Sequence, residues 1–97
     1  MTTNHQVHLS DAYVLSPTFL FRWEESQSAH VLLYPEGIVK LNDTGGEILK
    51  LCDGESTVDE LIDKLTERYA ANRVAIAESV IKFLEVSRVK GWIRVTS

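Results

Sequence analysis

Few residues of this chain have the type and spacing that chemistry requires. His5 and His8 form a His-x-x-His pair near the N-terminus, but a structural zinc site needs four ligands, usually including thiolates. Cys52 is the single cysteine, and no histidine lies near it in the sequence to act as its base. We therefore expect no metal site, no catalytic thiol and no cofactor, and we predict that the chain is not an enzyme.

Two adjacent glycines, Gly45 and Gly46, stand where a helix is expected to begin, and helix N-termini bind anions. The surrounding residues match neither Gly-x-x-x-x-Gly-Lys nor Gly-x-Gly-x-x-Gly, and Asp43 and Glu47 would repel a phosphate. Glycine in a helix costs about 1 kcal/mol relative to alanine. The pair therefore predicts a close approach of the backbone, to the sheet, rather than a phosphate site.

Composition and charge predict a small globular protein that binds neither nucleic acid nor membranes. The 97 residues, of which 44% are hydrophobic, allow one domain with one modest core. No apolar run approaches the ~18 residues of a membrane span, and the N-terminus does not have the pattern of a signal peptide. The net charge of −4 opposes binding to phosphates. A lone cysteine fits a reducing cytoplasm.

The charge is unevenly distributed along the chain. Residues 1–67 carry 4 basic and 12 acidic side chains, a balance of −8, whereas residues 68–97 carry 6 basic and 2 acidic ones, a balance of +4. The basic C-terminal third either attracts an acidic partner at close range or is the solvated face of a helix. The sequence alone leaves both alternatives open.

The first half of the chain predicts a three-stranded antiparallel sheet. Aromatic and β-branched runs at Phe19–Glu24, His30–Tyr34 and Ile38–Leu41 have the length of strands. The last two flank Pro35–Gly37, where proline presets φ and glycine accepts a positive φ, so they form a hairpin.

Helical spacing follows. Thr44–Cys52 is the first predicted helix, and a capping box of Thr57 and Glu60 begins the second. In the third, Val74–Val89, apolar side chains cover about 160° of the helix surface, against about 100° in an ordinary surface helix. This excess indicates either burial on two sides or one flank left open for a partner.

Three strands followed by three helices predict an α+β domain with a winged-helix-like arrangement. Residues 1–15 are expected to form a flexible N-terminal arm, followed by a domain over residues 16–97. The layout leaves a winged-helix nucleic-acid-binding domain as an alternative function, although the acidic total charge counts against it.

Ile38–Leu41 is last in the predicted sheet and is therefore an edge strand. A peptide can cover an exposed edge by adding a strand, and the broad apolar helix at Val74–Val89 would then form the other wall of a groove. Alternatively, Trp92–Val95 forms a short strand that closes the edge, and the helix is simply core. The residues alone favour neither alternative.

Several segments together resemble the PqqD family, the pyrroloquinoline quinone (PQQ) biosynthesis protein D. The most specific is Val31-Leu-Leu-Tyr-Pro-Glu-Gly-Ile-Val-Lys-Leu-Asn42. The resemblance covers about residues 16–95, and its other parts are Phe21–Gln27, Gly46–Leu49, Asp53-Gly54, Thr57-Val58 and Gly91–Ile93.

This resemblance implies a non-catalytic adaptor, a peptide-recognition element of ribosomal peptide modification. Such proteins bind the precursor peptide PqqA and present it to PqqE, a radical S-adenosylmethionine enzyme that holds the cofactors itself. The leader of the peptide is expected as an added strand between the third strand and the third helix. The candidate peptide-binding residues are Ile38, Val39, Lys40, Leu41, Ile76, Val80, Phe83 and Leu84, with Arg73 and Arg88.

Two hypotheses follow from this site. Arg73, Lys82, Arg88 or Lys90 would steer an acidic peptide into the groove, so high salt would slow association. A proline at Val39 would abolish binding if the Val39 amide faced the peptide. The oligomeric state stays open between monomer and homodimer.

Overall fold

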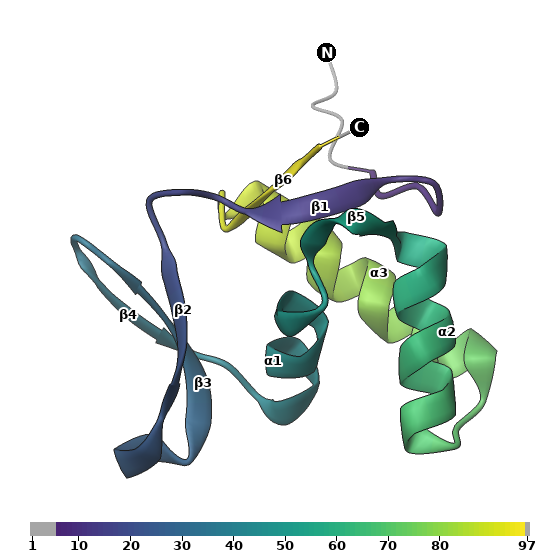
Figure 1. Ribbon diagram of the computed structural model, residues 1–97, viewed down its shortest axis with the longest axis horizontal. Coiled ribbons are helices and arrows are strands. Elements are labelled where there is room, and N and C mark those ends of the chain that lie inside the picture. The colour runs from purple at the N-terminus through teal and green to yellow at the C-terminus, as the bar shows by residue number, and fades with distance from the viewer. Residues whose placement is uncertain (1–5, 97) are drawn as a thin grey trace.

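The computed structural model describes residues 6–96, in which three α-helices and two small antiparallel sheets form an α+β domain (Figure 1). This confirms the predicted three-stranded sheet followed by three helices. None of the helices in this part of the chain is both long and apolar enough to cross a membrane. The elements are β1 (Ala12–Leu15), β2 (Leu20–Glu24), β3 (Ala29–Tyr34), β4 (Gly37–Lys40), α1 (Asp43–Lys50), β5 (Asp53–Thr57), α2 (Val58–Tyr69), α3 (Arg73–Val89) and β6 (Ile93–Val95).

Strands β2, β3 and β4 form the predicted meander, with β3 in the middle. The register places Leu32 of β3 between Phe21 of β2 and Val39 of β4. Leu32 is fully buried, and the rings and methyl groups beside it pack against the same core. β2 and β4 are both edges, and no other strand among residues 6–96 pairs with either.

Strand β1 is the middle of a second sheet, in the order β5-β1-β6, which sequence reasoning did not predict. Tyr13 is 1% exposed and Val7 belongs to the core, so this part of the expected flexible arm is built into the fold. Residues 1–5 of that arm lie outside the described residues. Because β6 pairs with β1, it does not close the edge at β4, which was the alternative.

Helix α1 is wedged between β3 and α3, and its two glycines permit the close contact. A Cβ atom on Gly46 would lie 2.6 Å from Nδ1 of His30 in β3, and one on Gly45 would lie 2.8 Å from Cε1 of Phe83 in α3. The predicted approach to the sheet is confirmed at Gly46. Gly45 approaches the third helix instead.

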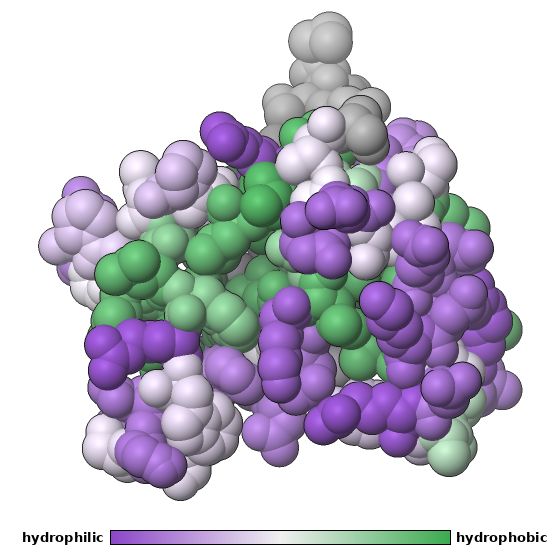
Figure 2. All heavy atoms as spheres, in the orientation of Figure 1, coloured by the Kyte–Doolittle hydropathy of each residue, from purple (hydrophilic) through white to green (hydrophobic). Residues whose placement is uncertain are grey.

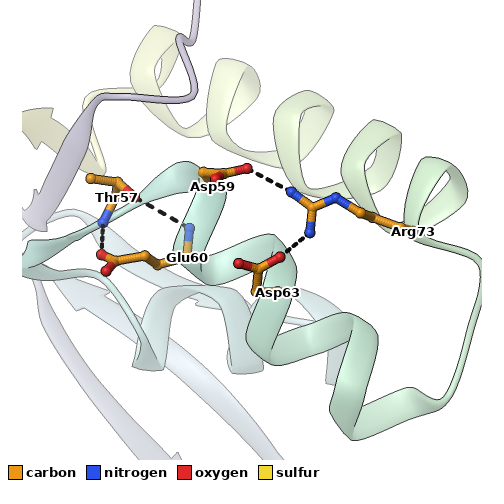
Figure 3. A network of polar contacts seen from close by, with 5 residues as sticks. All are labelled: Thr57, Asp59, Glu60, Asp63 and Arg73. Atoms are coloured by element: carbon orange, nitrogen blue, oxygen red, sulfur yellow. Dashed lines mark hydrogen bonds and ion pairs between the residues drawn. The ribbon is translucent and has the colours of Figure 1, made fainter.

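Helices α2 and α3 pack against each other, and polar contacts of Arg73 join them (Figure 3). The predicted capping box is present: the Thr57 backbone N–H donates to Glu60 Oε1 at 2.8 Å, and the Glu60 N–H donates to Thr57 Oγ1 at 3.2 Å. Arg73, the first residue of α3, reaches back to Asp59 at 2.6 Å and also pairs with Asp63. Helix α2 lies far from β4, on the other side of the domain in Figure 1.

Candidate functional site

Strand β4 presents an edge on which two backbone donors have no partner among residues 6–96. The Leu41 N–H donates to the His30 carbonyl at 3.0 Å, and bonded pairs alternate with non-bonded pairs along an antiparallel ladder. The Val39 amide therefore lies on the β3 side, whereas the amides of Ile38 and Lys40 point away from the sheet. Because of this register, a proline at Val39 would remove a bond within the sheet rather than one to a peptide.

Two hollows lie in this part of the molecule, one between α1 and α3 and one between the β2–β3–β4 sheet and the segment that follows α3. The first hollow, about 360 Å³, is lined by Asn42, Thr44, Gly45, Ile48, Ser79, Lys82, Phe83 and Val86. The second hollow, about 440 Å³, is lined by Phe19, Tyr34, Val39, Lys90 and Trp92. The ring centroids of Phe83 and Trp92 are 6.3 Å apart and join the two hollows. Figure 2 shows hydrophobic residues gathered around a hollow between the β4 side and the helices, and we call this whole region the groove.

The charged side chains that line the groove are both basic. Lys82 lines the first hollow and Lys90 the second, and Lys40 lies exposed on the β4 edge. None of these three lysines forms an ion pair with another residue between 6 and 96. The groove is therefore electropositive in a chain whose net charge is −4.

The four candidate residues of the edge strand lie in three different environments. Val39 lines the second hollow, and Ile38 is 54% exposed on the opposite face of the sheet. Lys40 is exposed on that opposite face too. Leu41 is 5% exposed and belongs to the core.

Of the four apolar candidates on α3, Phe83 lines the first hollow. Val80 and Leu84 are 1% and 0% exposed and belong to the core. Ile76 is half-buried against that core and lines neither hollow. The broad apolar surface of α3 therefore combines a buried face with a flank toward the first hollow. A further flank, at Val74, Ala77 and Ile81, lines a separate surface hollow outside the groove.

Both candidate arginines lie outside the groove. Arg73 is paired with α2, as described above. Arg88 donates to the Gln6 carbonyl at 2.9 Å and to the Tyr13 hydroxyl at 3.3 Å, and its guanidinium lies 5.6 Å from the centre of the Tyr13 ring. Burial and the hydrogen bond to Asp11 raise the pKa of Tyr13 to about 12, so this hydroxyl stays protonated as a donor to Asp11.

Sequence reasoning did not select Phe19, Tyr34, Val86 or Trp92, which line the hollows. Trp92 reaches the groove because its carbonyl accepts a hydrogen bond from the Ser16 N–H at 2.8 Å, next to the pairing of β6 with β1. The aromatic side chains of Phe19, Tyr34 and Trp92 were the feature that could have indicated a binding surface. Trp92 comes close to the other two because β6 pairs with β1, and no local pattern predicts that pairing.

The reactivity of Cys52 tests the prediction that the chain has no catalytic thiol. The thiol is buried and donates to the Ile48 carbonyl at 3.3 Å, and burial raises its pKa to about 12. At pH 8 the thiolate fraction is then only ~10⁻⁴, so a thiol reagent such as Ellman's should not react with the folded protein within an hour. In denaturant the same thiol should react within minutes. Rapid reaction of the folded protein would contradict the burial of Cys52.

The family model described as Coenzyme PQQ synthesis protein D (PqqD) matches residues 29–93, a span from β3 through α3 to the start of β6. The chain belongs to the PqqD family. The resemblance stated from the sequence is thereby confirmed.

Relatives within the PqqD family match nearly the whole chain. A PqqA binding protein of Azotobacter vinelandii is 45% identical over 85 residues, which are 88% of this chain and 91% of the relative. A PqqA binding protein of Pseudomonas paraeruginosa is 47% identical over 85 residues, with the same two shares. Both are binding proteins by name, and membership in this PqqD family confirms the prediction that the chain is not an enzyme.

Two solved structures share the fold. The PqqD truncation of Methylobacterium extorquens PqqCD, described as a functional and stand-alone recognition element for ribosomally synthesised and post-translationally modified peptides, has a TM-score of 0.79 and 30% identity. The match covers 91% of this chain and 94% of that one. TbiB1, in complex with the TbiA(beta) leader peptide, has a TM-score of 0.71 at 19% identity, over 84% of this chain and 94% of that one, and supports the fold alone.

Proposed function

We propose that this chain is a non-catalytic adaptor of PQQ biosynthesis that binds the precursor peptide PqqA as an added strand on β4. The observation that carries the proposal is the open β4 edge, whose Ile38 and Lys40 amides point outward beside a groove lined by apolar side chains. Strand addition uses main-chain hydrogen bonds for affinity and side-chain pockets for selectivity, and both are available at this edge. Relatives named PqqA binding protein support the identity of the peptide.

The residues of the site divide by what they offer a peptide. Ile38 and Lys40 supply backbone donors, whereas Val39 and Phe83 supply apolar walls. Beneath this surface, the buried side chains Leu41, Val80 and Leu84 hold the walls in place without touching the peptide. Lys82 and Lys90, rather than Arg73 and Arg88, would attract an acidic segment, so the expected slowing of association at high salt should depend on these two lysines.

We further propose that the chain presents PqqA to the radical S-adenosylmethionine enzyme PqqE. A strand held in a surface groove leaves the neighbouring residues of the peptide free to enter a second active site, and the cofactors then belong to that enzyme. The buried cysteine is compatible with work in the reducing cytoplasm.

Amide hydrogen exchange tests the strand addition directly. In the free protein the Leu41 amide should already be protected, because it donates to His30, while Ile38 and Lys40 exchange quickly. Saturation with PqqA peptide should slow exchange at Ile38 and Lys40 by about tenfold or more. NMR detection resolves the individual amides.

The other edge of the same sheet supplies the control for this experiment. By the same alternation, the Phe21 and Trp23 amides of β2 point outward, and their exchange should not change when PqqA binds. Protection of Phe21 and Trp23 in place of Ile38 and Lys40 would move the site to β2. Unchanged exchange at both edges would refute strand addition.

A further inference from the structure

We propose that Lys40 selects the peptide: the segment that adds to β4 carries an acidic residue flanked by two apolar residues, in the order apolar–acidic–apolar. This inference rests on the proposed function, because it assumes a strand on the β4 edge. It goes further by naming the chemistry of three consecutive positions in the bound peptide and the side chain that distinguishes them.

The alternation of β4 fixes which peptide positions face which way. Lys40 stands in one row with Val31 on the outer face of the sheet, while Val39 on the inner face lines the second hollow. Two residues beyond Lys40 the chain reaches Asn42, which lines the first hollow. An added strand would therefore place one side chain beside Lys40 on the outer face and its two neighbours on the inner face, toward the hollows.

The two inward positions suit apolar side chains. The second hollow is walled mainly by Phe19, Tyr34 and Trp92, and its one charged group is the flexible Lys90. The apolar wall of the first hollow consists of Ile48, Phe83 and Val86. A leucine or an aromatic residue at each inward position would cover these walls, whereas a charged one would lose much of its water against them. A basic one would in addition be repelled by Lys82 and Lys90.

The outward position is set by the charge of Lys40. This lysine is exposed and has no ion pair among residues 6–96. The other cation in its row, Arg22, is two strands away and pairs with Glu24 at 3.7 Å. A lysine on an edge strand discourages indiscriminate strand pairing. A carboxylate directly opposite gives a favourable cross-strand pair, while a basic residue there is repelled.

The pattern has the same order in both directions along the peptide, so it holds for parallel and antiparallel addition alike. Lys40 therefore acts as a filter on an edge that would otherwise accept any extended chain of suitable shape.

Three fluorescein-labelled peptides test the filter, with central sequences Leu-Glu-Leu, Leu-Gln-Leu and Leu-Lys-Leu in one Ser-Thr frame. Fluorescence anisotropy with the full chain at low salt should give dissociation constants that rise from glutamate to glutamine to lysine, by roughly two- to fivefold per step. The Lys40→Glu variant should reverse this order. Lys64→Glu changes an exposed lysine of α2, far from the groove, by the same charge and should leave the order intact.

PqqA titrated in parallel separates the inference from the proposed function. If PqqA binds but the three peptides bind equally, or do not bind, or keep their order with Lys40→Glu, then the filter at Lys40 is wrong and peptide binding stands. If PqqA itself does not bind the unmodified chain, the proposed function falls and the inference falls with it.

Discussion

Replacing Leu84 with alanine is expected to lower the free energy of unfolding by about 3 kcal/mol, within the 2–5 kcal/mol typical of such changes in a core. Leu84 is 0% exposed and packs in the core cluster beneath the groove. The cost has two parts: the apolar surface no longer buried, and the cavity that the surrounding side chains cannot fill. Urea unfolding followed by circular dichroism measures it, with an unchanged slope showing that the same transition is compared.

Val86→Ala, two residues further along the same helix, is the matched control for Leu84→Ala. Val86 is 42% exposed and lines the first hollow, so its truncation should change the free energy of unfolding by less than about 1 kcal/mol. Although Val86→Ala should affect stability little, it should weaken the affinity for PqqA several-fold. A small loss of stability for Leu84→Ala would contradict its place in the core and would return it to the candidate peptide contacts.

Gly46→Ala should destabilise the protein by about 1–3 kcal/mol, although alanine favours helices by about 1 kcal/mol over glycine. The new Cβ atom would lie 2.6 Å from Nδ1 and 3.1 Å from Cβ of His30. The imidazole cannot easily move, because it is stacked on Phe21 with ring centroids 4.9 Å apart and meets the edge of Trp23 at 5.1 Å. Overpacking therefore outweighs helix propensity at this position.

The double variant Gly46→Ala with His30→Ala tests that cause. If the clash with His30 explains the loss, the double variant should be more stable than the sum of the two single changes predicts, by 1 kcal/mol or more. Thermal or urea unfolding of all four proteins completes the cycle. A stabilised Gly46→Ala single variant, or strictly additive effects, would show that α1 does not press on β3 as the distances indicate.

Local signals predicted most of the elements that carry the groove. The capping box at Thr57 and Glu60 located the start of the second helix, and Pro35–Gly37 located the hairpin that makes β4 an edge. The positive φ predicted for Gly37 was wrong, because Gly37 is the first residue of β4 and pairs with Tyr34. These signals are readable because their physics is contained within a few neighbouring residues. Gly45 and Gly46 likewise predicted a close contact, because glycine destabilises a helix relative to alanine and close packing of the backbone can offset that loss.

The strands of the second sheet were not predictable in this way. β1 is only four residues long, and β5 has the composition of a turn, with Asp53 and Gly54 at its start. Strands this short become stable only when partners from distant parts of the chain lie beside them. These pairings determine the position of Trp92. Because the second sheet could not be predicted, the wall of the groove that Trp92 forms could not be predicted either.

The faces of α3 were unresolved for a related reason. A helical stripe shows which side chains cluster but not which neighbour covers each part of the stripe, and Val80 was therefore ranked with Phe83. The charge pattern of the sequence likewise did not show which cations are paired. Arg73 contributes to a basic segment in the sequence, but in the fold it pairs with two aspartates of α2. Burial and pairing are properties of the tertiary fold, and they separated the core of the site from its surface.

The pairing of β1 with β6 joins nearly opposite ends of the chain, with Tyr13 opposite Val95. Bringing such distant segments together carries a larger entropic cost than any local contact, so this pairing should form late in folding. Trp92 adjoins that pairing and walls the second hollow. During synthesis, the hairpin with its open edge would leave the ribosome long before the groove beside it is complete. Complete formation of the groove is thus tied to emergence of β6, and a nascent chain would expose the edge without yet having the Trp92 wall beside it.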